Sequence, residues 1–393
     1  MAGYLHGVET IEIDDGIRPI QTVRSSVIGL IGTAPDADAD KFPLNMPVLI
    51  PGRQRDVIDL GATGTLKNAC DGIFDQGVAP FIVIVRVAEG VDEDATLLNL
   101  IGDAADFSGV HAFKAAESIV KVTPRILCAP GFTHQRPGAA ANPVIAEILG
   151  LADILRAVVI ADAPGASTAA AIAYREDFDS ARLYIVAPGV KVFRGAGVVV
   201  EPASARVAGL IVRRDKDKGF WWSPSNQPLG GVVGIERPID FALNNGATES
   251  NLLNENGVAS VIHHNGYRLW GNKSAATDPI WQFLTVRRTA DLVYDSVERS
   301  MLWAMDRPLS QQLVEDVGNS VNAYLRNLTQ RGALLGGRAW LDPEINTPAE
   351  LKAGKLSIDF DLEPPAPLDR LTFRARRNDG YYEELVNAVS LAA

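Results

Sequence analysis

The sequence predicts an α/β fold of more than one domain, and three observations support this. From about residue 26 to residue 217, short apolar runs alternate with amphipathic stretches, which is typical of βαβ units around a mainly parallel sheet. Phe81–Val87 is apolar at nearly every position, as expected of a strand buried on both faces. After Gly271 the pattern changes to two long amphipathic segments, which indicates a separate C-terminal α+β domain.

The composition excludes several classes of protein. With 47% hydrophobic and 22% charged residues, the chain is expected to be globular with a substantial core. Its longest apolar run ends at Arg86, well short of the ~20 residues of a spanning helix, so we expect no membrane insertion. The net charge of −11 argues against nucleic-acid binding, which requires a basic face. Residues 1–15 show no secretory signal, so we expect synthesis in the cytoplasm.

The first elements are an arm and an N-terminal α/β region. Thr10–Asp14 alternates, with Ile11 and Ile13 on one face, which predicts a half-buried strand that must join a sheet. We assign residues 1–20 to this arm and residues 21–100 to the N-terminal α/β region. In that region we expect strands at Ser26–Gly32, Val48–Ile50 and Phe81–Val87, and a helix from about Thr65 to Gly77.

Residues 101–272 form the predicted central α/β domain. Asn142 followed by Pro143 predicts a helix start, because Asn is a favoured cap and Pro suits the first helical position. Pro202 opens another helix, whose basic end suits the negative pole of the helix dipole. Further elements are strands at 126–129, 157–161 and 183–187, and a helix at about 168–180.

Residues 273–377 form the predicted C-terminal domain. Its two long helices are Asp291–Met305 and Leu313–Leu328, and a capping box predicts a short helix from Thr347. We expect two alternating strands, Leu356–Leu362 and Leu371–Arg377, to pair as a hairpin.

Residues 378–393 form a C-terminal arm that the pattern leaves either extended or weakly helical. Tyr381, Leu385 and Val389 fit one helical stripe, whereas the lack of a cap also suits a strand. A run this short is unstable as an isolated helix in water, so we expect it to order against another surface.

A search for chemistry finds no motif. There is no phosphate-binding loop, no G-x-G-x-x-G between a strand and a helix, and no nucleophile elbow. The five histidines lack metal-ligand spacing, and Cys70 and Cys128 are predicted to be buried free thiols. We therefore expect no catalytic, cofactor-binding or metal-binding residues and no enzyme activity, although a triad assembled in three dimensions stays open because spacing does not reveal one.

Several short stretches carry family information when they are taken together. They are Ser25–Pro35, Pro124–Gly131, Trp222–Asn226, Gly266–Asn272, Ala333–Gly337, Lys355–Asp361 and Pro365–Asp369. In this order and at this total length, they resemble the tail sheath proteins of contractile-tailed phages and R-type pyocins.

The resemblance implies a fold and a function. It implies a central domain related in fold to subtilisin without its catalytic residues, an inner C-terminal domain facing the tail tube, and arms that join strands with neighbouring subunits. The implied function is structural: the chain polymerises into a helical sheath of stacked hexameric rings, which contracts to drive the tube through a cell envelope for genome ejection. The implied partners are further copies of the chain, the tail tube protein, and the baseplate and tail terminator proteins, in a virion assembled in the host bacterial cytoplasm.

These implications give particular residues a role in assembly. The residues expected to donate strands to neighbours are Ile11, Ile13, Tyr381, Leu385 and Val389. The hairpin residues expected to accept them are Ile358, Phe360, Leu371 and Phe373. On the outer face of the second long helix and just beyond it, we expect Arg326 and Arg331 to face the tube.

Two alternatives stay open. Within the same class, the chain would be the sheath of a phage-derived R-type bacteriocin. In another class, it would be a cytoplasmic α/β enzyme that binds a nucleotide or a small acid at strand ends.

Overall fold

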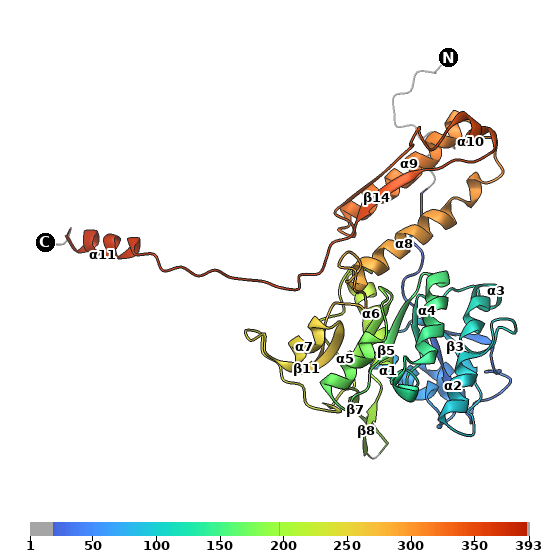
Figure 1. Cartoon of the computed structure of the whole chain (residues 1–393), viewed down its shortest axis with the longest axis horizontal. Coiled ribbons are helices and arrows are strands. Elements are labelled where there is room, and N and C mark those ends of the chain that lie inside the picture. Colours follow the sequence, from blue (N-terminus) through green and yellow to red (C-terminus); the bar gives the residue numbers. More distant parts are fainter. Residues whose placement is uncertain (1–18, 196, 391–393) are drawn as a thin grey trace, which may run out of the picture.

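A sheet of nine strands forms the centre of the larger part of the molecule (Figure 1). The structure is a computed structural model and describes residues 19–195 and 197–390. The strand order is β2-β3-β1-β4-β5-β6-β11-β12-β9. The six strands from β3 to β11 in this order are parallel, β2 and β12 run antiparallel to them, and β9 pairs antiparallel with β12 at the edge. The prediction of an α/β fold with a mainly parallel sheet is therefore confirmed.

The strands of this sheet are short and mostly buried. Their bounds are β1 Val27–Thr33, β2 Pro47–Pro51, β3 Phe81–Val87, β4 Ile126–Cys128, β5 Val158–Asp162, β6 Leu183–Ala187, β9 Gln227–Pro228, β11 Val258–His263 and β12 Tyr267–Trp270. Because β1 pairs with both β3 and β4, the predicted region 21–100 and the predicted domain 101–272 share one sheet.

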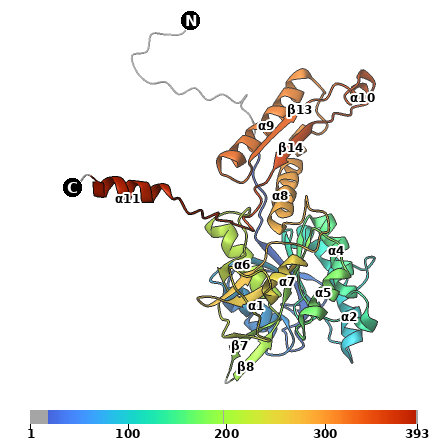
Figure 2. The ribbon, with the colours of Figure 1, turned by 60° about the vertical axis from the view of Figure 1, so that its left-hand side comes forward.

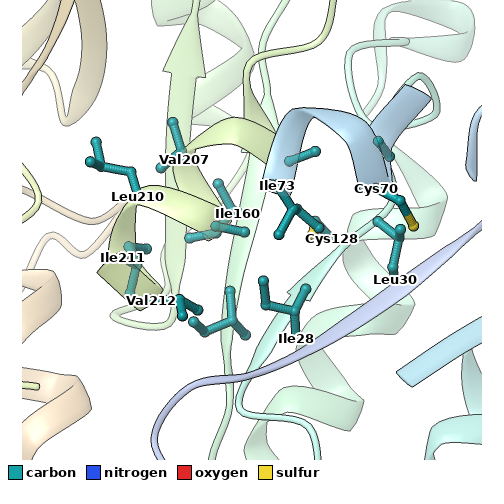
Figure 3. Close-up of a cluster of buried hydrophobic side chains, with 14 of the residues drawn as sticks. Ile28, Leu30, Cys70, Ile73, Cys128, Ile160, Val207, Leu210, Ile211 and Val212 are labelled. Carbon is teal, nitrogen blue, oxygen red and sulfur yellow. The ribbon is translucent and has the colours of Figure 1, made fainter. Parts of the chain in front are cut away.

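Helices cover both faces of the sheet and create two cores. Helices α1 (Leu66–Phe74) and α6 (Ser204–Asp217) pack on one face, against side chains such as Ile28 and Leu30 (Figure 3). The other face contacts α2, α4, α5 and α7, and Ile31 is among the strand residues that point that way. Their bounds are α2 Glu93–Ile101, α4 Pro143–Leu155, α5 Thr168–Glu176 and α7 Glu249–Glu255.

The predicted helix starts were accurate where a cap was visible in the sequence. Asn142 caps α4, because its side chain accepts a hydrogen bond of 3.0 Å from the backbone N–H of Ile145. Helix α6 begins at Ser204, two residues after the predicted Pro202. Shorter helical elements complete this part: α3 Ala116–Val120, and 3₁₀ helices at Gln54–Leu60, Gly109–Ala115 and Pro137–Ala139.

A second, three-stranded sheet lies at the end of the α/β domain that is far from the C-terminal unit (Figures 1 and 2). Its strands are β7 Val190–Arg194, β8 Gly197–Glu201 and β10 Gly234–Ile235.

Helix α8 (Leu284–Ser300) leads from the α/β domain to a separate C-terminal unit (Figures 1 and 2). In that unit, α9 (Gln311–Gln330) packs on a two-stranded sheet and shares a small core with α8. The other elements are a 3₁₀ helix Leu302–Ala304, β13 Gly336–Trp340, α10 Pro348–Lys352 and β14 Asp359–Glu363. The two long predicted helices are thus present, although the first begins at Leu284 and not at Asp291.

The predicted hairpin of Leu356–Leu362 with Leu371–Arg377 is wrong. Strand β14 pairs instead with β13, with Phe360 opposite Ala339. Residues 364–379 carry neither helix nor strand and run away from the unit to α11 (Gly380–Ser390) (Figures 1 and 2). Strand β13, the true partner of β14, begins with Gly336 and Gly337. Because glycines favour a loop in sequence-based reasoning, this strand was not predicted.

Candidate assembly surfaces

The carboxyl ends of the parallel strands are where an open α/β sheet usually binds ligands. Asp162 ends β5 there, and Ser204 at the start of α6 donates to its carboxylate from both its hydroxyl (2.5 Å) and its backbone N–H (2.9 Å). Both side chains are buried, and this burial raises the pKa of Asp162. In a Ser-His-Asp triad a histidine lies between the hydroxyl and the carboxylate. Here the Ser204 hydroxyl donates directly to Asp162, so the pair anchors the start of α6.

The other candidates for chemistry lie inside the cores. Cys70 and Cys128 are buried free thiols, as predicted, and burial raises the pKa of both. Within residues 19–195 and 197–390, no three His, Cys, Asp or Glu side chains are grouped so as to hold a metal ion. No helix of these same ranges has the length and apolar character needed to cross a membrane.

A buried ion pair joins the C-terminal unit to the α/β domain at the base of α8. The Arg288 side chain donates to Asp215 of α6 over 2.7 Å and also to the backbone oxygen of Ser25 over 2.9 Å. Asp215 accepts two further hydrogen bonds, from the hydroxyls of Ser25 (2.6 Å) and Ser26 (3.0 Å). Since both charged side chains are 5% exposed or less, this cluster fixes α6, α8 and the entry to β1 relative to one another.

Further ion pairs continue along α8. Three of its acidic side chains accept from arginines of the α/β domain: Asp291 from Arg182, Asp295 from Arg125, and Glu298 from Arg156. One basic side chain, Arg299, binds Glu117 of α3 in the opposite sense. This ladder holds α8 against the domain over several turns.

The N-terminal segment passes along the C-terminal unit before it enters the sheet. The backbone N–H of Val23 donates to the Ser296 hydroxyl over 3.0 Å, and the hydroxyls of Thr22 and Tyr324 are also 3.0 Å apart. Ile11 and Ile13 lie outside the described residues. The arm to which they belong therefore joins the described chain at the surface of the C-terminal unit.

A groove of about 740 Å³ lies in the C-terminal unit between the N-terminal half of α9 and β13. Its apolar lining comes from Leu309, Val314, Trp340, Leu341, Leu351 and Ile358. Beside it, the side chain of Asn322 bonds both backbone groups of Ala339, over 2.8 and 3.0 Å, and so covers part of the β13 edge. Helical spacing in the sequence does not reveal this contact, because it does not show that a strand lies alongside α9.

The structure does not bring the four predicted acceptor residues together. Ile358 lines the groove, whereas Phe360 packs against the small core that α8 and α9 share, with its ring 5.9 Å from that of Tyr294. Leu371 and Phe373 lie on the C-terminal arm and are 64% and 86% exposed. The hairpin fails as an acceptor because its second strand is absent from the unit.

The extended part of the C-terminal arm presents arginines interleaved with apolar side chains, and a mainly apolar helix follows it. Arg370, Arg374, Arg376 and Arg377 are all exposed on the extended part. The predicted donor residues Tyr381, Leu385 and Val389 lie on helix α11, not on a strand, with 59% to 69% of their surfaces exposed. Of the two conformations that the sequence pattern left open for this arm, the single subunit has the helix, in agreement with the stripe spacing.

The predicted tube-facing residues lie at the C-terminal end of α9. Arg326 is exposed. Arg331 is also exposed, but its guanidinium lies 5.5 Å from the ring centroid of Trp221, so it contacts the α/β domain.

Comparison with known proteins gives this architecture a family. The family model of the phage tail sheath protein central domain matches residues 105–275, and that of the phage tail sheath C-terminal domain matches residues 276–377. The tail sheath protein of Escherichia phage P2 is 35% identical over 402 residues, which cover 99% of this chain and 100% of that protein. A putative prophage major tail sheath protein of Pseudomonas aeruginosa (strain UCBPP-PA14) is 34% identical, over 98% of this chain and 99% of that protein.

Solved structures with the same fold come from contractile assemblies. The anti-feeding prophage helical sheath in its contracted state has a TM-score of 0.71 at 20% identity, covering 96% of this chain and 100% of that chain. The PVC sheath complex of an extracellular contractile injection system, also contracted, has a TM-score of 0.70 at 17% identity, covering 97% of this chain and 99% of that chain. Together with the sequence relatives, these matches show that the chain belongs to the phage tail sheath protein family and is a structural subunit of a contractile tail sheath.

Proposed function

We propose that this chain polymerises around a tail tube in the virion and that its arms hold the sheath together while it contracts. The observation that carries this proposal is the C-terminal arm, which leaves its own subunit and exposes Phe373, Tyr381 and Leu385 (Figure 1). Apolar side chains exposed in this number mark an interaction surface. In a sheath, the surface that covers them is another subunit.

The groove beside β13 is the proposed acceptor for strands. Each strand of the β13–β14 sheet has one side without a neighbouring strand among the described residues, and strand addition would satisfy the backbone groups on these sides that Asn322 does not already bind. We propose that Ile11 and Ile13 of one subunit pack at this sheet in a second subunit. The basic segment around Arg374 and Arg376 suits the same sheet, because β14 carries Asp359, Asp361 and Glu363.

The proposed assembly is an open helix built from stacked hexameric rings. A contact between two different surfaces of identical subunits gives a helix when its rotation does not close a ring. The ion pairs along α8 would keep each subunit rigid. Contraction would then change the angles between subunits, and the arms would act as flexible links between them. We propose that this movement uses no enzyme activity and no cofactor.

Electron microscopy of the purified full-length protein tests the proposal. We expect the purified protein to form hollow cylinders. In particles that also contain the tube and the baseplate, we expect these cylinders to become shorter and wider when contraction is triggered. Uniform dimers or tetramers that never polymerise would overturn the proposal in favour of a closed oligomer, as expected of an α/β enzyme.

An R-type bacteriocin would use the same kind of subunit. Particles purified from the producing cell distinguish the two uses, because a phage particle carries a DNA-filled head above the sheath.

A further inference from the structure

Helix α11 is acidic as well as apolar. Between Gly380 and Ser390 it contains Glu383 and Glu384 and no basic residue. Its apolar side chains Tyr381, Tyr382, Leu385, Val386 and Val389 are between 59% and 69% exposed. A surface that covers this helix therefore needs an apolar floor and a basic rim.

The α/β domain contains such a surface beneath the N-terminal segment. A pocket of about 460 Å³ lies between residues 23–27, residues 78–81 and helix α6. Its apolar lining is Val23, Val27, Val78, Pro80, Phe81 and Val212. Arg24 and Lys216 line it as well, with the Arg24 guanidinium 4.9 Å from the centroid of the Phe81 ring. The pocket holds no acidic lining residue.

We propose that α11 of one subunit docks in this pocket of a second copy, with Tyr381 and Leu385 toward the apolar floor and Glu384, about 100° around the helix from Leu385, toward Lys216 at the rim. The proposal rests on the sheath assembly proposed above and names the acceptor of the C-terminal helix within it. Attraction between unlike charges at the rim sets the orientation of such a contact, and the apolar burial supplies most of its free energy.

Charge separates this pocket from the groove beside β13. Glu315 lines the groove and no basic residue does, so the acidic helix is disfavoured there. The preceding arginine-rich segment has the opposite preference. The two parts of the arm therefore fit two different sites of a neighbour, the basic segment at the C-terminal unit and the acidic helix at the α/β domain.

The reach of the arm allows contact with another copy. Asp369 accepts a hydrogen bond of 3.0 Å from Asn272 of its own chain, so the free extended part is residues 370–379, which span up to about 30 Å at about 3.3 Å per residue. In both views α11 lies well away from the body of its own subunit (Figures 1 and 2). Docking would also press on Val23 and Arg24, which continue into the cluster of Ser25 with Arg288. The C-terminal arm of one subunit would thus brace the N-terminal segment of the next.

A disulfide cross-link in assembled sheath tests the contact. Leu385→Cys combined with Ala79→Cys places one thiol on the helix and one on an exposed residue of the pocket, and the two native thiols are buried. We expect mild oxidation of the sheath to give a ladder of covalent multimers. The matched control combines Leu385→Cys with Gln311→Cys, an exposed residue of the groove.

Each outcome has a defined meaning. A ladder only in the Gln311 control would overturn the proposal and assign the helix to the groove. A cross-link within one chain, or sheath that forms with no cross-link in either pair, would overturn it as well. Because sheath formation is scored separately by electron microscopy, a failure of the cross-link is distinguishable from a failure of the assembly function.

A charge exchange gives an independent measurement. Lys216→Glu should raise the protein concentration needed for half-maximal sedimentation of sheath about two- to five-fold, the range expected for an exposed ion pair. Adding Glu384→Lys to it should restore most of the loss. If the combined variant raises this concentration by as much as the separate substitutions together, the proposed rim contact is wrong.

Discussion

Arg299 and Glu117 show how single charges connect α8 to the α/β domain. The Arg299 guanidinium donates to both carboxylate oxygens of Glu117, and its Nε lies 2.9 Å from Asp295 one turn earlier on α8. These hydrogen bonds lower the pKa of Glu117 to about 2, with a smaller contribution from the Thr123 hydroxyl.

We expect Arg299→Gln to raise the pKa of Glu117 from about 2 toward its ordinary 4.5. Because the pKa is depressed in the folded protein, the pair stabilises the fold above about pH 4.5, and this contribution is lost as the pH falls toward about 2. The side chains are 42% and 53% exposed, so the effect on the free energy of unfolding is small. NMR titration of the Glu117 carboxyl measures the pKa, with Thr123→Val as the control for a smaller shift. An unchanged pKa in Arg299→Gln would contradict the assignment.

The buried Ser204 hydroxyl has a larger predicted effect on stability. Ser204→Ala removes one of the donors to the Asp162 carboxylate and leaves that oxygen buried. We expect a loss of about 1–3 kcal/mol in the free energy of unfolding, measured by urea denaturation. Ser118→Ala, at an exposed hydroxyl, is the control and should change stability by less than about 0.5 kcal/mol. Equal effects of the two substitutions would count against the anchoring role.

At the scale of elements, α8 shows what an apolar pattern hides. Its first turns, before Asp291, were not predicted, because Arg288 looks like a solvated position and yet is 4% exposed. Buried charge that is paired across elements breaks the apolar stripe on which sequence reasoning depends. By contrast, Asn142 and the apolar run of β3 could be read correctly, since caps and buried strands are encoded locally.

We expect Arg288→Ala to lower the free energy of unfolding by about 3–5 kcal/mol, because it leaves the buried Asp215 without its charged partner. It should also speed amide hydrogen exchange across residues 22–27, since Arg288 holds the backbone oxygen of Ser25. Arg326→Ala, at an exposed position of α9, is the matched control. Protection of residues 22–27 equal to that of the unsubstituted protein would show that other contacts hold the segment.

The failed hairpin has a related cause at the same scale. Alternation of Leu371 and Phe373 predicts the two faces of a strand but not which strand pairs with it. In the single subunit Leu371 and Phe373 stay exposed. Their apolar pattern therefore fits a contact surface that their own subunit does not provide. We propose that these residues contact a neighbouring subunit, and a pattern that reflects such a contact misleads when the fold of one chain is derived from it.

At the scale of the whole molecule, the two arms leave from the same unit. The N-terminal segment passes Tyr324 of α9, and the C-terminal arm begins directly after β14. The proposed links to neighbours therefore start at the C-terminal unit and end at two sites of the neighbour, the C-terminal unit for the strands and the α/β domain for α11.

Deletion of residues 1–15 should give a folded monomer that does not form sheath. The described contacts of the core begin beyond this segment, so the melting temperature should stay nearly unchanged. The measurements are thermal unfolding and electron microscopy. Ile11→Asp with Ile13→Asp in the full-length chain is the sharper variant, because it keeps the arm and removes only its apolar face. Contractile tubes from either variant would show that this arm is dispensable.

Reversal of charge on α9 locates the surface that faces the tube. Arg326 is exposed to solvent, whereas Arg331 also stacks on Trp221 of its own chain. We therefore expect different effects of substitution at the two positions. Arg326→Glu should weaken co-assembly with an acidic tube surface and leave the melting temperature unchanged, since rim charges mainly set orientation and encounter rate. Arg331→Glu should in addition cost about 0.5–1 kcal/mol of stability through the lost cation–π contact. Co-sedimentation with tube at two salt concentrations measures the first effect, and urea denaturation measures the second. Normal co-assembly of Arg326→Glu would place the tube contact on another face of the C-terminal unit.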